Sequence, residues 1–168
     1  MDQNSNIEIR LTVKEDLIHL KEWFREPGML RWFPIIDNRE INDATDRWLH
    51  FCNYKCSYTA SYNGVPCGVA ALYLTPYKKL VHQCEWGIIL SSEYQHMGVG
   101  KVLSEALFKL AKDTFDIEML HLQVYEGNAK AQKFFKKIGF KEFGRQTHWI
   151  KEGPGKYRGR IFMEKFIK

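Results

Sequence analysis

A chain of 168 residues, 45% of them hydrophobic, can bury the core of one domain, which we expect to span residues 1–168. No apolar run approaches the about 20 residues that cross a bilayer. The first ten residues lack the basic start and apolar stretch of a secretory signal, so we expect a cytoplasmic protein without membrane contact. The net charge of +5 favours anionic partners only in general, because the basic residues are spread along the chain.

The N-terminal part of the chain predicts one strand and two helices. Residues 7–13 alternate between apolar and other side chains, which is the period of a strand. Thr12 and Glu15 have the spacing of a capping box, and apolar residues then follow at helical intervals. A second helix is predicted to begin near Asp37 or Asn38.

The middle of the chain predicts three strands and a long helix. Asn63-Gly64 lies between two strand-like runs within residues 57–74, and this dipeptide is a strong signal for a hairpin turn. Residues 81–90 predict a further strand, and an apolar stripe of helical period begins at Val99. The residues expected to face away from that stripe are Ser104, Glu105, Lys109 and Lys112.

The C-terminal part predicts a strand, a helix and a final pair of strands. Residues 119–125 alternate as a strand, and Asn128 is placed to cap a helix that ends before Gly139. Two strands near residues 145–151 and 157–167 close the chain. The order of elements predicts a mixed α/β (α+β) domain built on one sheet.

The spacing of the four cysteines does not predict a metal site. No C-x-x-C pair occurs among them, and no histidine has the spacing that completes a zinc site. We therefore expect no metal, and buried reduced thiols at Cys52, Cys56, Cys67 and Cys84.

A loop with two glycines separates the strand at 81–90 from the helix at Val99. The unpaired N–H groups of a helix N-terminus favour an anion, and glycines allow a phosphate to approach the backbone. The loop is not a P-loop, because Val102 stands where Ser or Thr is needed. It is not a Rossmann fingerprint either, because the third glycine is replaced by Leu103. The pattern Q-x-x-G-x-G remains, at residues 95–100.

This pattern resembles the acetyl-CoA loop of the GNAT superfamily of N-acetyltransferases. Residues 128–140 resemble the family's N-x-x-A-x-x-x-[Y/F]-x-x-x-G-F segment, and the hairpin at Asn63-Gly64 resembles its N-G-x-x-x-G strand pair. Residues 84–95 are similar to the ribosomal-protein-alanine acetyltransferase-like branch. The resemblance implies a mixed, mostly antiparallel central sheet of about seven strands with flanking helices. It also implies acetyl-CoA as co-substrate.

The resemblance places the cofactor on three segments of the chain. Backbone groups of Ile88, Ile89 and Leu90 match contacts to the pantetheine arm. Asn128 and Phe135 match residues beside that arm. The positions that match pyrophosphate contacts are Gln95, His96, Met97, Gly98, Val99, Gly100 and Lys101.

Glu85 is the candidate general base for deprotonating the acceptor amine, directly or through a water. A purely structural role, ordering the strand through a bond to backbone or an arginine, stays open; His82, Glu93 and His121 are weaker candidates. Phe135 stands where many family members have the tyrosine that protonates the leaving thiol. Phenylalanine cannot do so, and neither Tyr94 nor Tyr125 is at the matching place.

The resemblance also implies an acceptor site between residues 25–40 and the hairpin at 151–160. Trp32, Phe33 and Trp149 would line it or belong to the core. The predicted function is transfer of acetyl to a primary amine in a ternary complex, either a small amine or a protein N-terminus or lysine. A non-catalytic acyl-CoA-binding module is the alternative. A homodimer is possible, and no nucleic-acid partner is expected because no binding motif accompanies the charge.

Overall fold

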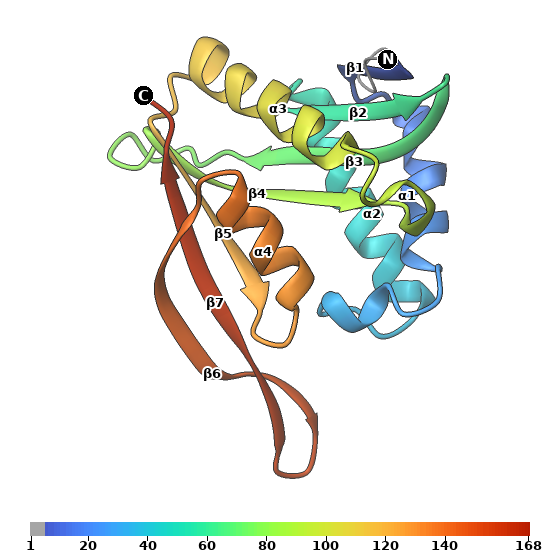
Figure 1. Ribbon diagram of the computed structural model, residues 1–168, viewed down its shortest axis with the longest axis vertical. Coiled ribbons are helices and arrows are strands. Elements are labelled where there is room, and N and C mark those ends of the chain that lie inside the picture. Colours follow the sequence, from blue (N-terminus) through green and yellow to red (C-terminus); the bar gives the residue numbers. More distant parts are fainter. Residues whose placement is uncertain (1–5) are drawn as a thin grey trace.

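The structure is a computed structural model that describes residues 6–168 (Figure 1), so half of the stretch on which the expectation about the first ten residues rests lies outside the described part. The helices are α1 (Leu17–Phe24), α2 (Asn38–Asn53), α3 (Val99–Phe115) and α4 (Ala129–Lys137). The strands are β1 (Ile7–Leu11), β2 (Ser57–Tyr62), β3 (Val65–Tyr73), β4 (Gln83–Leu90), β5 (Met119–Tyr125), β6 (Lys141–Gly153) and β7 (Lys156–Phe166). Short 3-10 turns lie at Lys14–Asp16 (η2), Leu30–Trp32 (η3) and Ser92–Tyr94 (η4).

The seven strands form one sheet in the order β1-β2-β3-β4-β5-β7-β6. Every neighbouring pair is antiparallel except β4 and β5, which run parallel. The predicted fold class is therefore confirmed: a mixed, mostly antiparallel seven-stranded sheet with four flanking helices.

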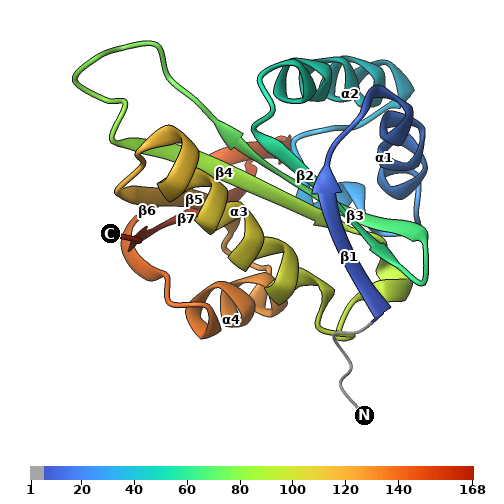
Figure 2. The same ribbon diagram turned by 90° about the horizontal axis from the view of Figure 1, so that it is seen from above.

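The helices cover the two faces of the sheet unequally (Figure 2). Helices α3 and α4 lie on one face, where Leu103, Phe108 and Phe135 pack against Trp86 of β4. Helices α1 and α2 lie on the other face, over Val69 of β3 and its neighbours. On that second face, β5 and β7 extend beyond the two helices, and the β6–β7 hairpin projects from the body of the molecule (Figure 1).

The predicted turns and caps are confirmed at three points. Asn63 and Gly64 both have positive φ, at 50° and 80°, as the two-residue hairpin between β2 and β3 requires. Asp37 accepts a hydrogen bond of 2.9 Å from the backbone N–H of Glu40 at the start of α2. Asn128 accepts one of 3.2 Å from the N–H of Ala131 at the start of α4.

Two local predictions are wrong, and in both the hydroxyl forms a hydrogen bond inside the fold. Thr12 does not cap a helix: its hydroxyl shares a hydrogen bond of 2.8 Å with that of Ser57, and Asp16 accepts from Val13 N–H instead. Ser104 does not face solvent: it is fully buried and donates a hydrogen bond of 2.7 Å to the carbonyl of Gly100, one turn earlier in α3. A serine can be buried in a helix when the preceding turn supplies its acceptor.

The cysteines are free thiols, with Cys56, Cys67 and Cys84 buried and Cys52 half-buried. Burial raises the pKa of Cys56 and Cys67 to about 11 and that of Cys84 to about 12. Such thiols are poor nucleophiles and poor metal ligands at neutral pH. Within residues 6–168, no cluster of metal-ligating side chains and no helix able to span a membrane is found.

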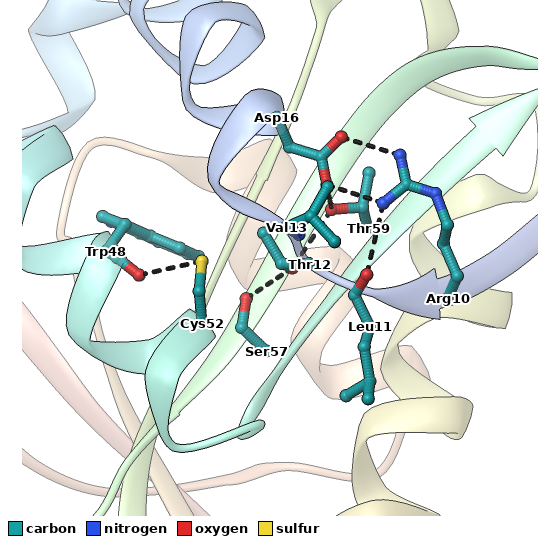
Figure 3. Close-up of polar contacts among 9 residues, drawn as sticks. All are labelled: Arg10, Leu11, Thr12, Val13, Asp16, Trp48, Cys52, Ser57 and Thr59. Atoms are coloured by element: carbon teal, nitrogen blue, oxygen red, sulfur yellow. Dashed lines mark hydrogen bonds and ion pairs between the residues drawn. The ribbon is translucent and has the colours of Figure 1, made fainter.

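A buried polar cluster fastens the start of α1 to β1 and β2 (Figure 3). Arg10 binds both carboxylate oxygens of Asp16 at 2.7 Å, and Thr59 donates to the same carboxylate at 2.9 Å. Burial by itself would raise the pKa of Asp16, but the hydrogen bonds from Arg10, Val13 and Thr59 outweigh it and hold the pKa below its ordinary value. The carboxylate is thus kept charged inside the fold.

Asp16→Asn tests this cluster. The amide cannot accept from Arg10, Val13 and Thr59 together, so we expect the free energy of unfolding at pH 7 to fall by about 2 kcal/mol. A depressed carboxylate pKa stabilises above its unfolded value and the benefit is lost on acidification, so the deficit should shrink below about pH 4. Chemical denaturation at several pH values measures both effects. Glu15→Gln, one residue away and exposed, should change little; an equal deficit in both variants would contradict the prediction.

Candidate active site

The parallel pairing of β4 with β5 is short, and the two strands separate where it ends. Their register comprises three residue pairs and stops at Glu85 opposite His121. Strand β4 continues to Leu90 paired only with β3, and β5 continues to Tyr125 paired only with β7. The two facing edges therefore leave backbone N–H and C=O groups without a strand partner, and a bound chain could satisfy them. We call this opening the fork.

A loop with free N–H groups lies beyond the end of β4. Gly98, the residue before α3, has a φ of 86°, and His96 has a φ of 71°. The carbonyl of Gly98 accepts from the N–H groups of Lys101 and Val102, which closes the first turn of the helix. In the described part of the chain, the N–H groups of His96, Met97, Gly98, Val99 and Gly100 have no protein acceptor. This concentration of donors at a helix N-terminus suits an anion.

The two glycines of this loop are required for different reasons. At Gly98 the backbone lies in the left-handed region, and a Cβ atom there would meet no protein atom within 4 Å. At Gly100 a Cβ atom would lie 3.1 Å from Leu90 and 3.3 Å from Phe134. Gly98 therefore faces open space at the donor loop, whereas Gly100 also serves the packing of α3 against β4 and α4.

Positive charge lies beside the loop. The side chain of Gln95 turns back toward β4, with its amide nitrogen 3.5 Å from the carbonyl of Leu90. Lys130, in the first turn of α4, donates a hydrogen bond of 2.5 Å to the side-chain oxygen of Gln95. This contact brings α4 against the donor loop, and a lysine at this point favours anion binding.

Glu85 lies at the fork, on the sheet face of α1 and α2, because side chains alternate along β4 and Ile89 packs against those helices. Gln123 of β5 donates a hydrogen bond of 2.7 Å to its carboxylate. Arg160 of β7 in turn donates to the side-chain oxygen of Gln123. Glu85 is thus oriented by an amide whose own orientation is fixed by an arginine.

The weaker base candidates are placed less favourably. His121 is opposite Glu85 at the last pair of the parallel register. His82 precedes β4, is exposed, and contributes its backbone carbonyl to the N–H groups of Glu118 and Met119. Glu93 is exposed in η4. Of these residues, only His121 shares the fork with Glu85.

Phe135 is part of an aromatic cluster below the fork. It is 9% exposed, and its ring lies 5.9 Å from that of Trp86 and 6.2 Å from that of Phe140. Tyr94 packs instead on Tyr62, with ring centroids 5.8 Å apart. The cluster places an apolar ring, and no hydroxyl, at the sequence position discussed above. Asn128 uses its side-chain oxygen as the cap of α4, which leaves its amide N–H groups for other partners.

The loop after α1 meets the last hairpin, and these are the two segments between which the resemblance places the acceptor site. Arg158 of β7 donates a hydrogen bond of 2.8 Å to the carbonyl of Arg31. Trp32 and Trp149 both pack edge-on against Tyr125, with ring centroids at 6.3 and 4.9 Å. Neither tryptophan is part of a core cluster of the described residues.

Phe33 and Tyr125 lie in different surroundings. Phe33 packs on Phe24 at 5.1 Å and belongs to the core under α1, as the core interpretation predicts. Tyr125 is 4% exposed beneath the guanidinium of Arg158, whose carbon lies 4.9 Å from the ring centre. Burial raises the pKa of Tyr125, and the arginine offsets only part of this increase.

Sequence reasoning did not single out two polar side chains at the fork. Gln123 binds Glu85, and Tyr73 at the end of β3 pairs in register with Glu85. Neither belongs to a motif. A signal for Tyr73 did exist in the glycine at position 87, because a glycine inside a strand often marks the close approach of another group.

The chain is similar to known proteins in sequence and in fold. The profile of the acetyltransferase (GNAT) family matches residues 17–140. The chain is 27% identical to the spermidine N(1)-acetyltransferase of Escherichia coli K12 over 97% of its length and 87% of that protein. It is 31% identical to an N-alpha-acetyltransferase of Sulfurisphaera tokodaii over 70 residues, which is 42% of each chain.

The fold is also similar to that of yncA from Salmonella typhimurium, a structure solved with its cofactor acetyl-CoA. The TM-score is 0.80 at 17% identity, with 97% of this chain and 95% of the other covered. At this identity the likeness concerns the fold alone. Because the family profile covers most of the chain, the protein belongs to the acetyltransferase (GNAT) family.

Proposed function

We propose that the protein is an acetyl-CoA-dependent N-acetyltransferase, working as one domain across residues 1–168, in which a primary amine attacks the thioester directly in a ternary complex. The observation that carries this proposal is the fork between β4 and β5, which opens beside the donor loop at the start of α3. The donor loop would bind an anion, and the fork would offer unpaired backbone groups to an amide-containing arm. Acetyl-CoA has both parts, a pyrophosphate and a pantetheine chain.

The cofactor is assigned to the residues around these two features. The N–H groups from Gln95 to Lys101 would hold the pyrophosphate, with Lys130 adding positive charge. Backbone groups of Ile88, Ile89 and Leu90 would bind the pantetheine amides along the free edge of β4. Asn128 would donate from its amide to the arm, and Phe135 would lie under it.

Glu85 is the proposed base. An amine with a pKa near 10 is mostly protonated at neutral pH and must lose a proton before it attacks. The carboxylate lies at the point where β4 and β5 separate, and Gln123 occupies only one of its oxygens. The other oxygen can accept the proton directly or through a water. Backbone N–H groups of the fork would stabilise the negative oxygen of the tetrahedral intermediate.

For the acceptor, the relatives point in two directions, to a polyamine and to a protein N-terminus. Three guanidinium groups lie at the acceptor end, on Arg31, Arg158 and Arg160. Arg158 is paired with Glu152, whereas the hydrogen bonds of Arg160 go to the neutral amides of Gln123 and Gln146. Each unneutralised cation opposes a polycationic acceptor, so we propose a peptide N-terminus of the ribosomal-protein-alanine type.

A non-catalytic acyl-CoA-binding module is the competing function, because Phe135 cannot donate a proton. A thiolate with a pKa of about 8.5 is already a fair leaving group, so the missing hydroxyl does not preclude turnover. Release of CoA from acetyl-CoA in the presence of primary amines distinguishes the two. Binding without any amine-dependent release would favour the module.

Gly98→Ala tests the cofactor assignment. A methyl group there would meet no protein atom but would occupy the space above the donor loop, so we expect the affinity for acetyl-CoA to fall tenfold or more, about 1.4 kcal/mol. Titration calorimetry measures it. Gly155→Ala is the matched control, since Gly155 also has positive φ and open space but lies at the hairpin tip. Equal affinities of the two folded variants would rule out the assignment.

Glu85→Gln tests the base. The substitution keeps the shape and removes the proton acceptor, so kcat should fall by about 100-fold with acetyl-CoA affinity unchanged. The loss should be largest at low pH, where unprotonated amine is scarcest. Steady-state rates between pH 6 and pH 9 check this, with Glu93→Gln in η4 as the control. Parallel pH profiles of wild type and Glu85→Gln at similar rates would make Glu85 structural.

Acceptor choice is tested by comparing spermidine with a peptide that begins with alanine. We expect kcat/KM for the peptide to exceed that for spermidine by about tenfold or more, the size of one to two unscreened charge contacts. Arg31→Gln should raise kcat/KM for spermidine and so lower the ratio of peptide to spermidine. The reason is that the Arg31 side chain lies exposed over Trp32, where its charge can repel a polycation. Lys79→Gln, exposed in the β3–β4 loop, should not lower the ratio. A ratio that favours spermidine would overturn the peptide assignment.

A further inference from the structure

The hydroxyl of Tyr73 lies over Gly87 of β4, at the edge of the fork. Tyr73 is the last residue of β3 and is paired with Glu85, so the two side chains lie on the same face of the sheet. Its ring stacks on Phe51 of α2, with centroids 4.9 Å apart and an interplanar angle of 18°. A Cβ atom on Gly87 would lie only 2.4 Å from the Tyr73 oxygen. The phenol therefore leans across β4 into the space that a side chain at position 87 would fill.

The hydroxyl is available for a ligand. Among residues 6–168, no group is hydrogen-bonded to it. The unpartnered side-chain atoms that are sealed from solvent in this part of the chain are Nε1 of Trp86 and Nε of Arg158, and the Tyr73 oxygen is not one of them. It is thus unpaired and not fully sealed from solvent, while stacking on Phe51 fixes the half-buried ring that carries it.

Gly87 lies just beyond the last pair between β4 and β5, and before the backbone groups assigned to the pantetheine arm. An arm that runs from the loop at Gln95–Lys101 back along β4 brings its sulfur end to this point. We propose that the Tyr73 hydroxyl is the proton donor to the leaving thiolate, in place of the group that Phe135 lacks. The inference rests on the proposed acetyltransferase function.

Glu85 and Tyr73 together account for every proton that is transferred. The protonated amine first releases one proton through Glu85 to solvent. The amine nitrogen then bonds to the thioester carbonyl carbon, and its second proton passes to Glu85. The carbon–sulfur bond breaks with its electron pair on sulfur, and Tyr73 gives its proton to that sulfur. The tyrosinate recovers a proton from the carboxyl of Glu85, leaving an amide and a thiol.

The charge on Glu85 links the two proton transfers. Burial raises the pKa of Tyr73, and the negative charge of Glu85 raises it further, so the phenol is fully protonated at neutral pH. When Glu85 takes up the proton of the amine, that charge disappears and Tyr73 becomes a stronger acid. The other titratable groups on this face of β5 and its β7 partners are His121, Tyr125, Arg160 and Glu164, and Arg158 lies over Tyr125. The ring's own neighbour on α2, Phe51, is apolar.

The test uses four full-length proteins: wild type, Tyr73→Phe, Phe135→Tyr and the double variant. Spermidine and the alanyl peptide serve as acceptors, and CoA release is followed. Tyr73→Phe keeps the ring on Phe51, so we expect unchanged melting temperature and acetyl-CoA affinity. We expect kcat to be about 30-fold lower, below the usual range for acid catalysis because a thiolate is already a fair leaving group. Phe135→Tyr should restore most of the loss in the double variant. Tyr77→Phe, exposed in the β3–β4 loop, is the control.

The outcomes separate this inference from the proposed function. Absence of acetyl transfer by the wild type to any primary amine would remove both. An active wild type with a Tyr73→Phe rate within twofold of it would remove only the proton donor. A loss of kcat that persists in the double variant would assign the hydroxyl to acceptor or oxyanion binding and overturn the proposal. Loss of acetyl-CoA affinity in Tyr73→Phe would do the same, by making the role structural.

Discussion

The shortness of the pairing between β4 and β5 is the constraint on which the site depends. Parallel strands normally satisfy each other's edges along their length. Here only three pairs form before the strands part, so backbone groups that would otherwise be buried in the sheet remain open on both sides. The helices α3 and α4 hold β4 from one face, and α1 and α2 hold it from the other. The opening is therefore a rigid feature of the fold.

Local signals in the sequence identify much of the fold. Asn63-Gly64, Asp37 and Asn128 act within four residues of their partners, so their roles follow from spacing alone. The predictions for Thr12 and Ser104 are wrong because a hydroxyl can bond any acceptor that the fold brings near it, and spacing in the sequence does not show which one. For Thr12 the partner, Ser57, lies 45 residues away in the sequence.

The candidate site likewise has one part that local sequence predicts and another that depends on the tertiary fold. The donor loop is contiguous and is supported by backbone groups, so its motif could be recognised without tertiary information. Gln123 of β5 binds Glu85, Arg160 of β7 binds Gln123, and Tyr73 of β3 is paired with Glu85, so their arrangement depends on strand order and register. A one-residue slip of β3 against β4 would carry Tyr73 to the other face. No spacing in the sequence encodes that register directly, although Gly87 marks where it matters.

The contact between Arg158 and the carbonyl of Arg31 has a consequence for how an acceptor is received. This single hydrogen bond ties the projecting hairpin to the segment that follows α1, two parts of the chain 127 residues apart. The protein's own atoms therefore join the hairpin to this segment. On the proposed function, an acceptor that binds between them would lose less affinity to ordering of the protein than it would between independently moving segments. Selectivity at this end would then arise from shape and charge already in place, with little contribution from induced fit.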